Sequence, residues 1–325
     1  MNAITLFAGA GGADIGLQRA GVQHLACVEG DATACATLRA AGFPAVHAWI
    51  GNPPPGSSLT GWRWDGGPVD LLWASPPCQP YSQAGKQLGA DDPRDGWPAT
   101  LEAIRQIRPR WVIVENVGGS PIDAWAAELG PSLFRPGLYP HVSTRFLDAA
   151  DWGLPSHRRR EFLVAGPQPY RWPEPTHCGP DAPVAARLRL LPWVGFGEAL
   201  GLVDVIAKED RGAGMMERHG EPTMLTPDQP MGALRCGGQG GYLLLPATTI
   251  CGAEASGPGS SKSRSKVDAA IGRRLTCREA AILVGFPPDY PFAGGSNATF
   301  KQAGNAVAPI MAEVLARSLS QQDTQ

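Results

Sequence analysis

The residues best suited to chemistry lie in a proline-rich stretch that follows an apolar run. Residues 74–82 read Ala-Ser-Pro-Pro-Cys-Gln-Pro-Tyr-Ser, directly after Val-Asp-Leu-Leu-Trp at 69–73. Prolines cannot donate to a sheet ladder, so this pattern predicts a buried strand that ends at Trp73 and a stiff loop that holds Cys78. Ligands of open α/β sheets bind at the carboxyl ends of strands. Cys78 is therefore a candidate nucleophile, although a buried packing role would also suit a cysteine.

A carboxylate follows the next apolar run. Residues 111–114 predict a buried strand, and they lead into Glu115, Asn116 and Val117. We expect this strand end to lie beside the one that carries Cys78. A carboxylate in that place is more typical of a functional site than of packing.

A basic turn comes next, at residues 151–164, where Arg158, Arg159 and Arg160 precede another apolar strand. Alone, consecutive arginines indicate a solvated or phosphate-facing cluster.

The beginning of the chain predicts a ligand-binding turn. An apolar strand at 3–7 breaks into the glycine turn 8–14, and a helical pattern follows. Glycine lets backbone amides approach a ligand at a helix N-terminus, although an ordinary tight connection reads the same. A second strand, 23–28, leads to Glu29. Dinucleotide folds place an acid for the ribose at this position, about 20 residues after the glycines.

Together these motifs resemble those of the cytosine-C5 DNA methyltransferases. The cysteine loop differs from the family's usual form mainly by Tyr81 in place of Phe. The glycine turn, Glu-Asn-Val, the arginine motif, an Arg-x-Leu-Thr segment and Gly-Asn follow in family order between residues 4 and 309. The resemblance implies a doubly wound, mostly parallel α/β sheet, Rossmann-like and of the S-adenosylmethionine-dependent methyltransferase type. It also implies a second, smaller, irregular β-containing recognition domain.

The resemblance also implies roles for four residues. Cys78 attacks C6 of a cytosine that has been flipped out of duplex DNA. Glu115 hydrogen-bonds N3 and N4 of the base, Arg160 donates to O2, and Arg158 buttresses Glu115. A methyl group then passes from S-adenosyl-L-methionine to C5. No metal is required, and the base that removes the C5 proton is not identified.

Binding residues follow from the same motifs. The expected S-adenosyl-L-methionine contacts are Phe7, Ala8, Gly9, Gly11, Gly12, Glu29, Trp49, Pro76 and Asn305. The expected DNA contacts are Gln79, Ser82, Lys86, Arg94, Arg235, Lys262 and Arg264.

The chain departs from the family pattern in three places. Gly30 follows Glu29, where an aromatic residue is common; residues 47–50 read His-Ala-Trp-Ile, where Gly-Asp-Ile is common; and Ser156 replaces Gln. Our hypothesis is that Trp49 stacks on the adenine. Packing of Trp49 under the prolines at 53–55 is an equal alternative.

Composition limits the setting of this chemistry. The chain has 325 residues, a net charge of −2 and a pI near 6.3, so DNA must be met by local basic patches. Seven cysteines without a Cys-x-x-Cys pair argue against a zinc site or a disulfide framework and favour a reducing compartment. With no leader and no long apolar run, neither secretion nor membrane spanning is indicated. We expect a bacterial cytoplasmic protein, or a phage-encoded one acting there.

We expect three parts: a catalytic and cofactor-binding domain at 1–167, a target recognition domain with hinge at 168–299, and a C-terminal helix at 300–325 that returns to the catalytic domain. The glycine-rich segment 83–98 predicts a loop, and Leu101, Ile104 and Ile107 predict a helix. Thr276 and Glu279 form a capping pattern before a helix, and the last helix is expected through Leu319.

The sequence is thus identified as a DNA (cytosine-5-)-methyltransferase, of the kind found in restriction-modification, that acts on a short specific sequence. Its expected partner is double-stranded DNA, with a cognate restriction enzyme as a second partner that the family allows, and the chain is expected to be monomeric. RNA methylation is one alternative, because a branch of the family acts on tRNA, but that branch's Cys-Phe-Thr segment is not seen. A DNA-binding pseudoenzyme is another.

Overall fold

A parallel sheet with two antiparallel strands at one edge forms the centre of the molecule. The structure is a computed structural model that describes residues 1–51, 57–78, 80–81, 92, 94–131, 137–202, 204–210, 224–232, 241–246 and 273–323. Within these residues the sheet has seven strands in the order β3-β2-β1-β6-β7-β9-β8. The parallel strands are β1 (Asn2–Leu6), β2 (Gln23–Glu29), β3 (Ala45–His47), β6 (Leu71–Ala74) and β7 (Trp111–Asn116). β9 (Arg159–Gly166) runs antiparallel to β7 and to β8 (His141–Asp148).

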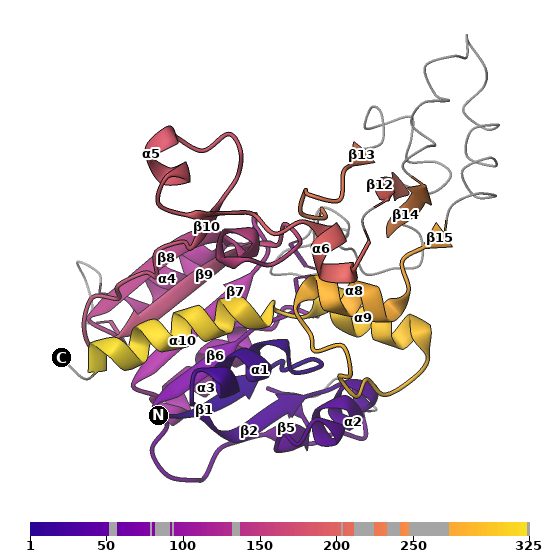
Figure 1. Cartoon of the computed structure of the whole chain (residues 1–325). Helices are drawn as coiled ribbons and strands as arrows, with labels where there is room; N and C mark the ends of the chain where they lie inside the picture. Colours follow the sequence, from indigo (N-terminus) through magenta and orange to yellow (C-terminus); the bar gives the residue numbers. More distant parts are fainter. Residues whose placement is uncertain are drawn as a thin grey trace.

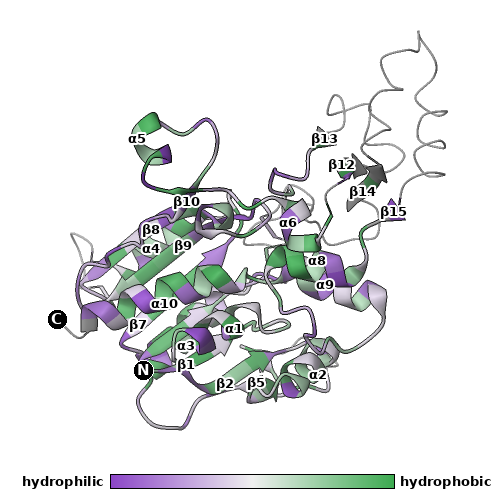
Figure 2. Ribbon diagram, viewed as in Figure 1, coloured by the Kyte–Doolittle hydropathy of each residue, from purple (hydrophilic) through white to green (hydrophobic). Residues whose placement is uncertain are grey.

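Helices cover both faces of this sheet (Figure 1). Alternate residues of the strands point to opposite faces. Ala3, Trp73 and Ile113 pack with α1 (Gly12–Arg19) and α10 (Pro309–Asp323). Their strand neighbours, such as Ile4 and Leu72, pack with α3 (Trp97–Ile107) and α4 (Ile122–Leu129). The expected doubly wound, mostly parallel sheet is confirmed, and Figure 2 shows its strands as largely hydrophobic.

A second, smaller sheet lies apart from the first. Its described strands run β13 (Met224–Leu225), β12 (Val205–Asp210), β14 (Gly241–Pro246) and β15 (Arg273–Arg274), and all pair antiparallel. Shorter elements lie between the two sheets in sequence: β10 (His177–Cys178), α5 (Val184–Arg187), β11 (Leu191–Pro192) and α6 (Phe196–Leu200). β10 pairs with β11, and α6 shares the core of the small sheet. The second, β-containing region expected from the sequence is present.

The remaining elements lie between the strands of the large sheet or follow the small one. In the first half they are α2 (Ala32–Ala40), β4 (Trp49–Ile50), β5 (Gly61–Trp62) and the 3₁₀ turn η2 (Ala149–Trp152). α8 (Cys277–Val284) and α9 (Ser296–Asn305) precede α10. The expected boundary between residues 299 and 300 falls inside α9. Both α8 and α9 supply residues to the core under the glycine turn, among them Ala281 and Ala303 with Ala10.

Several element ends differ from the sequence expectation. The strand before Cys78 ends at Ala74 rather than Trp73, because Ala74 still pairs with Leu6 and Val114. α3 begins at Trp97, so it takes the last two residues of the expected loop 83–98; Pro98 suits the first helical turn, where its missing N–H costs nothing. The last helix continues from Leu319 to Asp323. The capping box of Thr276 and Glu279 is confirmed.

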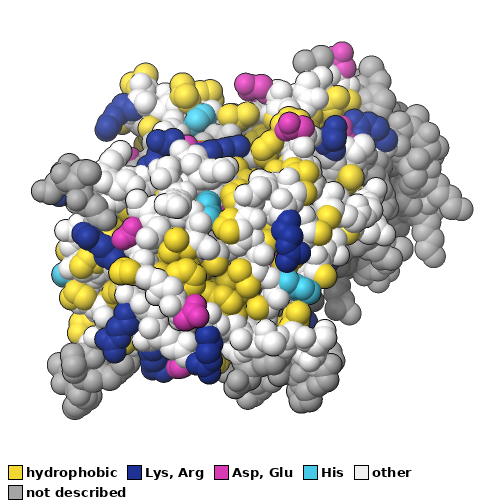
Figure 3. Space-filling model, turned by 90° about the horizontal axis from the view of Figure 1, so that it is seen from below, with side chains coloured by type: hydrophobic (Ala, Val, Ile, Leu, Met, Phe, Trp, Pro, Cys, Tyr) yellow, Lys and Arg dark blue, Asp and Glu magenta, His cyan; other side chains and the backbone are white. Residues whose placement is uncertain are grey.

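Charged side chains are mixed on the face seen from below. Figure 3 shows Lys and Arg side chains dispersed over the described residues of this face, with Asp and Glu among them. None of the described helices is both long and apolar enough to span a membrane.

Candidate active site

The loop that carries Cys78 is held at three points. Its first residue, Ser75, donates from its N–H to the carbonyl of Leu6 (3.2 Å). The Asn116 side chain donates to the carbonyl of Pro76 (3.1 Å), and the Tyr81 N–H donates back to the carbonyl of Cys78 (3.0 Å). Cys78 is half-buried. Its thiol is therefore presented by a fixed loop at the carboxyl edge of β6.

Tyr81 anchors the far side of this loop. Its ring packs edge-on against Trp125 (5.8 Å between centroids), and Trp125 stacks on Trp97. Burial raises the pKa of the Tyr81 hydroxyl, and the nearby Asp95 carboxylate, which hydrogen-bonds it, raises it further. Tyr81 thus stays a neutral donor, so the substitution of Phe by Tyr adds a hydrogen bond to an aromatic contact.

Glu115 and Arg160 form a mostly buried ion pair beside this loop. Arg160 Nε lies 2.9 Å from Glu115 Oε1, and their side chains are 17% and 9% exposed. Glu115 is the fifth residue of β7, and Arg160 is the second of β9, the antiparallel neighbour of β7. Antiparallel pairing brings the start of β9 to the edge where β7 ends. The structure therefore brings together Cys78, Glu115 and Arg160, as the sequence led us to expect.

Charges act on the Cys78 thiol in opposite directions. Burial raises the pKa of the thiol, and the Glu115 carboxylate raises it further. The guanidinium groups of Arg160 and Arg158 lower it, but the net pKa stays above the ordinary value. The free protein thus holds Cys78 mostly as a thiol, and a change at Glu115 would alter its ionisation.

Arg158 is buried to a degree unusual for arginine. Only 2% of the residue is exposed, and its Nη2 donates to the carbonyl oxygens of Gly304 (2.8 Å) and Ala306. These bonds tie the start of β9 to the C-terminal end of α9, whose last residue, Asn305, is exposed. The expected support of Glu115 by Arg158 stays a prediction, while Arg160 has the ion pair with Glu115 described above.

Ser156, which stands where the family commonly has Gln, has a structural partner. Its hydroxyl donates to the carbonyl of Leu283 in α8 (2.7 Å), and the residue is 2% exposed. The serine thus joins the turn before β9 to α8.

Glu29 and the glycine turn form a second polar site on the same edge. Glu29 accepts the N–H of Gly9 at one carboxylate oxygen and the N–H of Asp31 at the other, both at 2.7 Å. Burial raises the pKa of Glu29, and these backbone donors only partly oppose it. The carboxylate therefore fixes the turn and retains lone pairs for hydroxyl donors of a ligand.

The glycines of this turn serve different purposes. Gly9 has φ +57°, and a Cβ added there would meet nothing within 4 Å. A Cβ on Gly12 would lie 2.2 Å from the Val307 carbonyl, so Gly12 permits the approach of the C-terminal segment. Open space above Gly9, beside the Glu29 carboxylate, suits the methionine and ribose parts of the expected S-adenosyl-L-methionine.

Phe7, Pro76 and Trp49 lie around this turn. A Cβ on Gly96 would be 2.8 Å from the Phe7 ring and 2.9 Å from Pro76, so these residues are close neighbours. Carbons of the Trp49 ring lie 3.6 and 3.7 Å from the Cβ position of Gly30, which follows Glu29. Trp49 is thus near the ribose acid, as the stacking hypothesis requires, while the prolines at 53–55 lie outside the described residues.

Six of the seven expected DNA contacts lie outside the described residues: Gln79, Ser82, Lys86, Arg235, Lys262 and Arg264. Arg94 is described: its guanidinium binds both oxygens of Asp92, at 2.9 and 2.7 Å, and its side chain is 53% exposed. An arginine held in this way is oriented, and its exposed side stays available for a phosphate.

The sequence reasoning missed Asn116 as a functional residue. Its neighbour Glu115 faces the reactive thiol, whereas Asn116 holds the carbonyl of Pro76 and also accepts the N–H of Val117 (2.9 Å). A polar residue next to the acid at a buried strand end was the available signal, since it needed a buried partner.

Comparison with known proteins agrees with this geometry. The family model described as C-5 cytosine-specific DNA methylase matches residues 1–186 and 239–321. Type II methyltransferase M.NaeI of Lentzea aerocolonigenes is 31% identical over 98% of this chain and 74% of its own. Type II methyltransferase M.NgoMIV of Neisseria gonorrhoeae is 29% identical over 97% of this chain and 96% of its own.

Solved structures share the fold at low identity. A DNMT2 of Spodoptera frugiperda has a TM-score of 0.65 and 16% identity, and the match covers 98% of this chain and 99% of that one. A putative DNA modification methyltransferase encoded within an Escherichia coli prophage has a TM-score of 0.58 and 18% identity, and both chains are covered fully.

Proposed function

The chain belongs to the C-5 cytosine-specific DNA methylase family, and from this membership we propose that it methylates a flipped-out cytosine through a covalent Cys78–C6 bond. It is a DNA cytosine-5 methyltransferase. The observation that carries the proposed mechanism is the meeting of three groups at one sheet edge. The Cys78 thiol interacts with the Glu115 carboxylate and the Arg160 guanidinium, and those two form an ion pair of 2.9 Å.

The first step is nucleophilic attack. The Cys78 sulfur forms a bond to C6, and the electrons of the C5–C6 double bond move into the ring toward N3. A stacked cytosine cannot reach a thiol held in this loop, so the base must leave the duplex first. The loop contributes position, since its bonds to Leu6 and Asn116 fix the backbone around Cys78.

Glu115 passes a proton to cytosine N3 in this step. Cytosine N3 becomes basic as the sulfur bond forms, and a proton delivered through Glu115 neutralises it. The thiol of Cys78 loses one proton when its sulfur bonds to C6, and N3 gains one. The adduct therefore has the same number of protons and the same net charge as the thiol and the cytosine together. Arg160 then donates to O2, where the negative charge also collects. The pair of Arg160 and Glu115 thereby keeps both groups in the plane of the base.

The cofactor site fits S-adenosyl-L-methionine. When bound, this molecule supplies an electrophilic methyl group to C5. Gly9 offers open space, Glu29 offers carboxylate oxygens to the ribose hydroxyls, and Phe7 and Pro76 border the site, with Ala8, Gly11, Gly12 and Asn305 as further proposed contacts. We propose that Trp49 stacks on the adenine. Loss of the C5 proton to a base, which water can provide, then expels the Cys78 sulfur as a thiolate. N3 gives up its proton through Glu115, and this proton restores the Cys78 thiol.

Double-stranded DNA is the proposed substrate, within a short specific sequence. The matched relatives are named type II methyltransferases and come from bacteria, which supports a cognate restriction enzyme as partner and the bacterial cytoplasm as the place of action. The region at 168–299 is the proposed recognition domain, and a monomer is sufficient for the mechanism.

Base-resolution methylation mapping tests this function. A plasmid from a methylation-free host that expresses the chain should carry 5-methylcytosine in one short motif, and Cys78→Ala should abolish it. A duplex with 5-fluorocytosine in that motif should trap the wild-type chain covalently, because the fluorine blocks proton loss. An unmarked plasmid from a soluble, cofactor-binding protein would contradict the DNA substrate, and tRNA would be tested next.

A further inference from the structure

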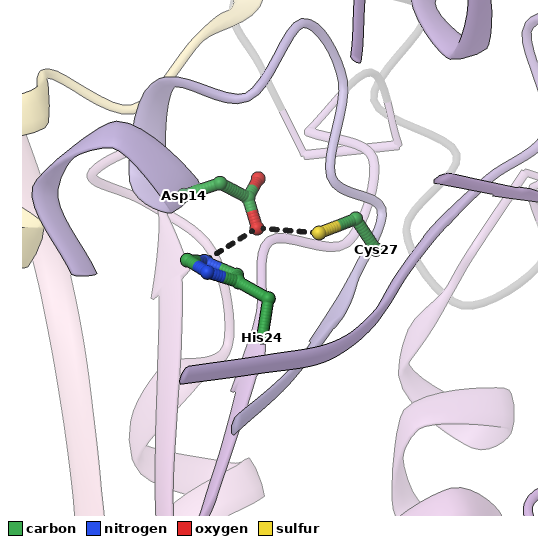
Figure 4. A group of neighbouring side chains, drawn as sticks. All are labelled: Asp14, His24 and Cys27. Atoms are coloured by element: carbon green, nitrogen blue, oxygen red, sulfur yellow. Dashed lines mark hydrogen bonds and ion pairs between the residues drawn. The ribbon is translucent and has the colours of Figure 1, made fainter. Parts of the chain in front are cut away.

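A buried cluster of three metal-ligating side chains lies beneath the glycine turn and takes no part in the proposed mechanism. Asp14 comes from α1, and His24 and Cys27 come from β2. Asp14 Oδ1 is 3.1 Å from Cys27 Sγ and 3.4 Å from His24 Nε2, and one ligand atom from each residue lies within 4.8 Å of the others. Figure 4 shows the imidazole and the thiol pointing at the same carboxylate oxygen.

The cluster contains polar atoms that lack hydrogen-bond partners. The His24 side chain is 6% exposed and Asp14 is wholly buried. Within the described part of the chain, His24 Nε2 and Asp14 Oδ2 take part in no hydrogen bond. Leaving such atoms unpaired in the interior is unfavourable, because they lose their hydrogen bonds to water and gain none in the protein. His24 Nε2 is nevertheless aimed at the Asp14 carboxylate, and Phe43 packs edge-on against the imidazole at 5.1 Å, which restricts its rotation.

The Cys27 thiol donates a hydrogen bond to Asp14 Oδ1, and the spacing of these donors is also close to that around a metal ion. Zinc bonds of about 2.0–2.3 Å to O, N and S place neighbouring donors of a tetrahedron roughly 3.3–3.7 Å apart. The measured O–S and O–N separations of 3.1 and 3.4 Å need only small shifts to reach such values. A carboxylate, an imidazole and a thiol form a donor set typical of Zn²⁺. We propose that Asp14, His24 and Cys27 bind a structural Zn²⁺ ion.

The charges balance at such a site. Burial, together with Asp14, raises the pKa of the Cys27 thiol, so zinc binding must release the thiol proton to solvent. The resulting thiolate and the Asp14 carboxylate neutralise Zn²⁺, and His24 binds as the neutral imidazole. Asp14 Oδ2 can bind as a second carboxylate oxygen. The lack of a Cys-x-x-Cys pair in the sequence argued against a zinc site. This cluster was missed on that basis, because its donors come from a helix and a strand.

The site would join α1 to β2 at the level of the cofactor turn. Asp14 follows Gly12 by two residues, and Cys27 precedes Glu29 by two. An ion here would fix the helix N-terminus relative to the ribose acid. It would therefore stabilise the catalytic domain without contacting the substrate.

Metal analysis of the full-length chain tests the proposal. Protein expressed with added zinc should retain about one equivalent per chain after desalting. Replacement by Co²⁺ should give a thiolate-to-cobalt charge-transfer band. His24→Gln and Cys27→Ser should each lower the retained metal at least about tenfold. Removal of zinc from the wild type by a chelator should lower Tm, and added Zn²⁺ should restore it.

Two matched cysteine variants separate this site from other thiols. Cys178→Ser, on β10, and Cys78→Ser, at the nucleophile, should both keep the zinc and the cobalt band. A band that disappears in Cys78→Ser but persists in Cys27→Ser would overturn the proposal. So would a wild-type chain that retains no more zinc than His24→Gln and shows no change of Tm with chelator. If Cys27→Ser does not fold, His24→Gln and the wild-type titration still decide the outcome.

Discussion

The seven-stranded sheet is packed on both faces, whereas the described residues of the smaller four-stranded sheet share one small core. Each face of the large sheet has its own cluster of buried residues, and at least two helices contribute residues to each cluster. The small sheet shares a cluster of six described residues, among them Phe196 and Leu244, with α6 and α8. The large sheet can hold Cys78 and Glu115 rigidly. Among the described residues, the small sheet has the smaller buried core.

Two arginine–glutamate pairs show the same contrast. Arg160 and Glu115, in the large sheet, are 17% and 9% exposed in their side chains. Arg273 and Glu279, beside the small sheet, are 50% and 17% exposed, and Glu279 also closes a capping box with Thr276. The charges of the first pair act on the Cys78 thiol, and the second pair lies at the capped start of α8. Similar pairs therefore serve chemistry in one region and local stability in the other.

The largest contrast is expected from removing one buried phenylalanine from each region. Phe162 of β9 and Phe196 of α6 are both fully buried. Phe162→Ala should cost about 3–5 kcal/mol of the free energy of unfolding, because its neighbours on β7 and β8 prevent collapse of the cavity. Phe196→Ala should weaken DNA binding while S-adenosyl-L-methionine still binds. Urea unfolding measures the loss of stability, and titrations with a DNA duplex and with the cofactor measure the two binding affinities.

Equal loss of cofactor binding in the two variants would contradict the separation of the regions. Leu188, which is 82% exposed, offers a control, since Leu188→Ala should change neither quantity.

Much of the catalytic edge was predictable because its signals are local. An apolar run stopped by two prolines placed Cys78 past a strand end, and Glu115 followed another run of the same kind. Thr276 and Glu279 predicted the start of a helix from a pattern that is only four residues long. Strand pairing was also implied, since parallel strands bring their carboxyl ends to one edge.

Other features depend on contacts between distant segments and gave no local signal. The partners of Arg158 are carbonyl groups of residues 304 and 306, more than 140 residues away. Asp14, His24 and Cys27 meet only because α1 folds back onto β2. The antiparallel hairpin of β8 and β9, which carries Arg160 to Glu115, also depends on tertiary pairing. Sequence motifs identified Arg158 and Arg160 as important without showing what they touch, and they gave no sign of the cluster of Asp14, His24 and Cys27.

The second prediction compares the two glutamates directly. Glu115→Gln should lower the methylation rate about 10²–10³-fold, because a neutral amide can neither deliver a proton to N3 nor balance Arg160. Glu279→Gln should leave the rate of the chemical step unchanged. Single-turnover transfer of a labelled methyl group to a duplex substrate measures this step. A comparable loss in Glu279→Gln would show that the helix pair also supports the chemistry.

The third prediction concerns the ionisation of Cys78. Since its pKa is raised, alkylation by iodoacetamide in the free protein should be slow at neutral pH and should accelerate as the pH rises. Glu115→Gln removes a negative charge that raises the pKa, so its alkylation curve should shift to lower pH, with a severalfold faster reaction at neutral pH. Arg160→Gln should shift the curve to higher pH.

Mass spectrometry of the Cys78 peptide follows this reaction, and the Cys178 peptide serves as internal control. Identical curves for wild type and Glu115→Gln would mean that burial alone sets the ionisation of Cys78.

The smallest effect is expected at the helix pair. Burial alone would raise the pKa of Glu279, but the hydrogen bonds from Arg273 and Thr276 outweigh burial and lower it. A lowered pKa in the folded state adds stability above the ordinary value of 4.5, and this stability is lost as the pH falls through the lowered pKa. Glu279→Gln keeps a capping oxygen but loses the charge, so it should cost at most about 1 kcal/mol at neutral pH, given the exposure of Arg273. Chemical unfolding at a series of pH values should show the difference from wild type shrinking in acid. If the difference in the free energy of unfolding between wild type and Glu279→Gln is the same at neutral and acid pH, Glu279 acts through the helix cap alone. Its charge would then have no stabilising role, and the comparison with the Arg160–Glu115 ion pair would fail.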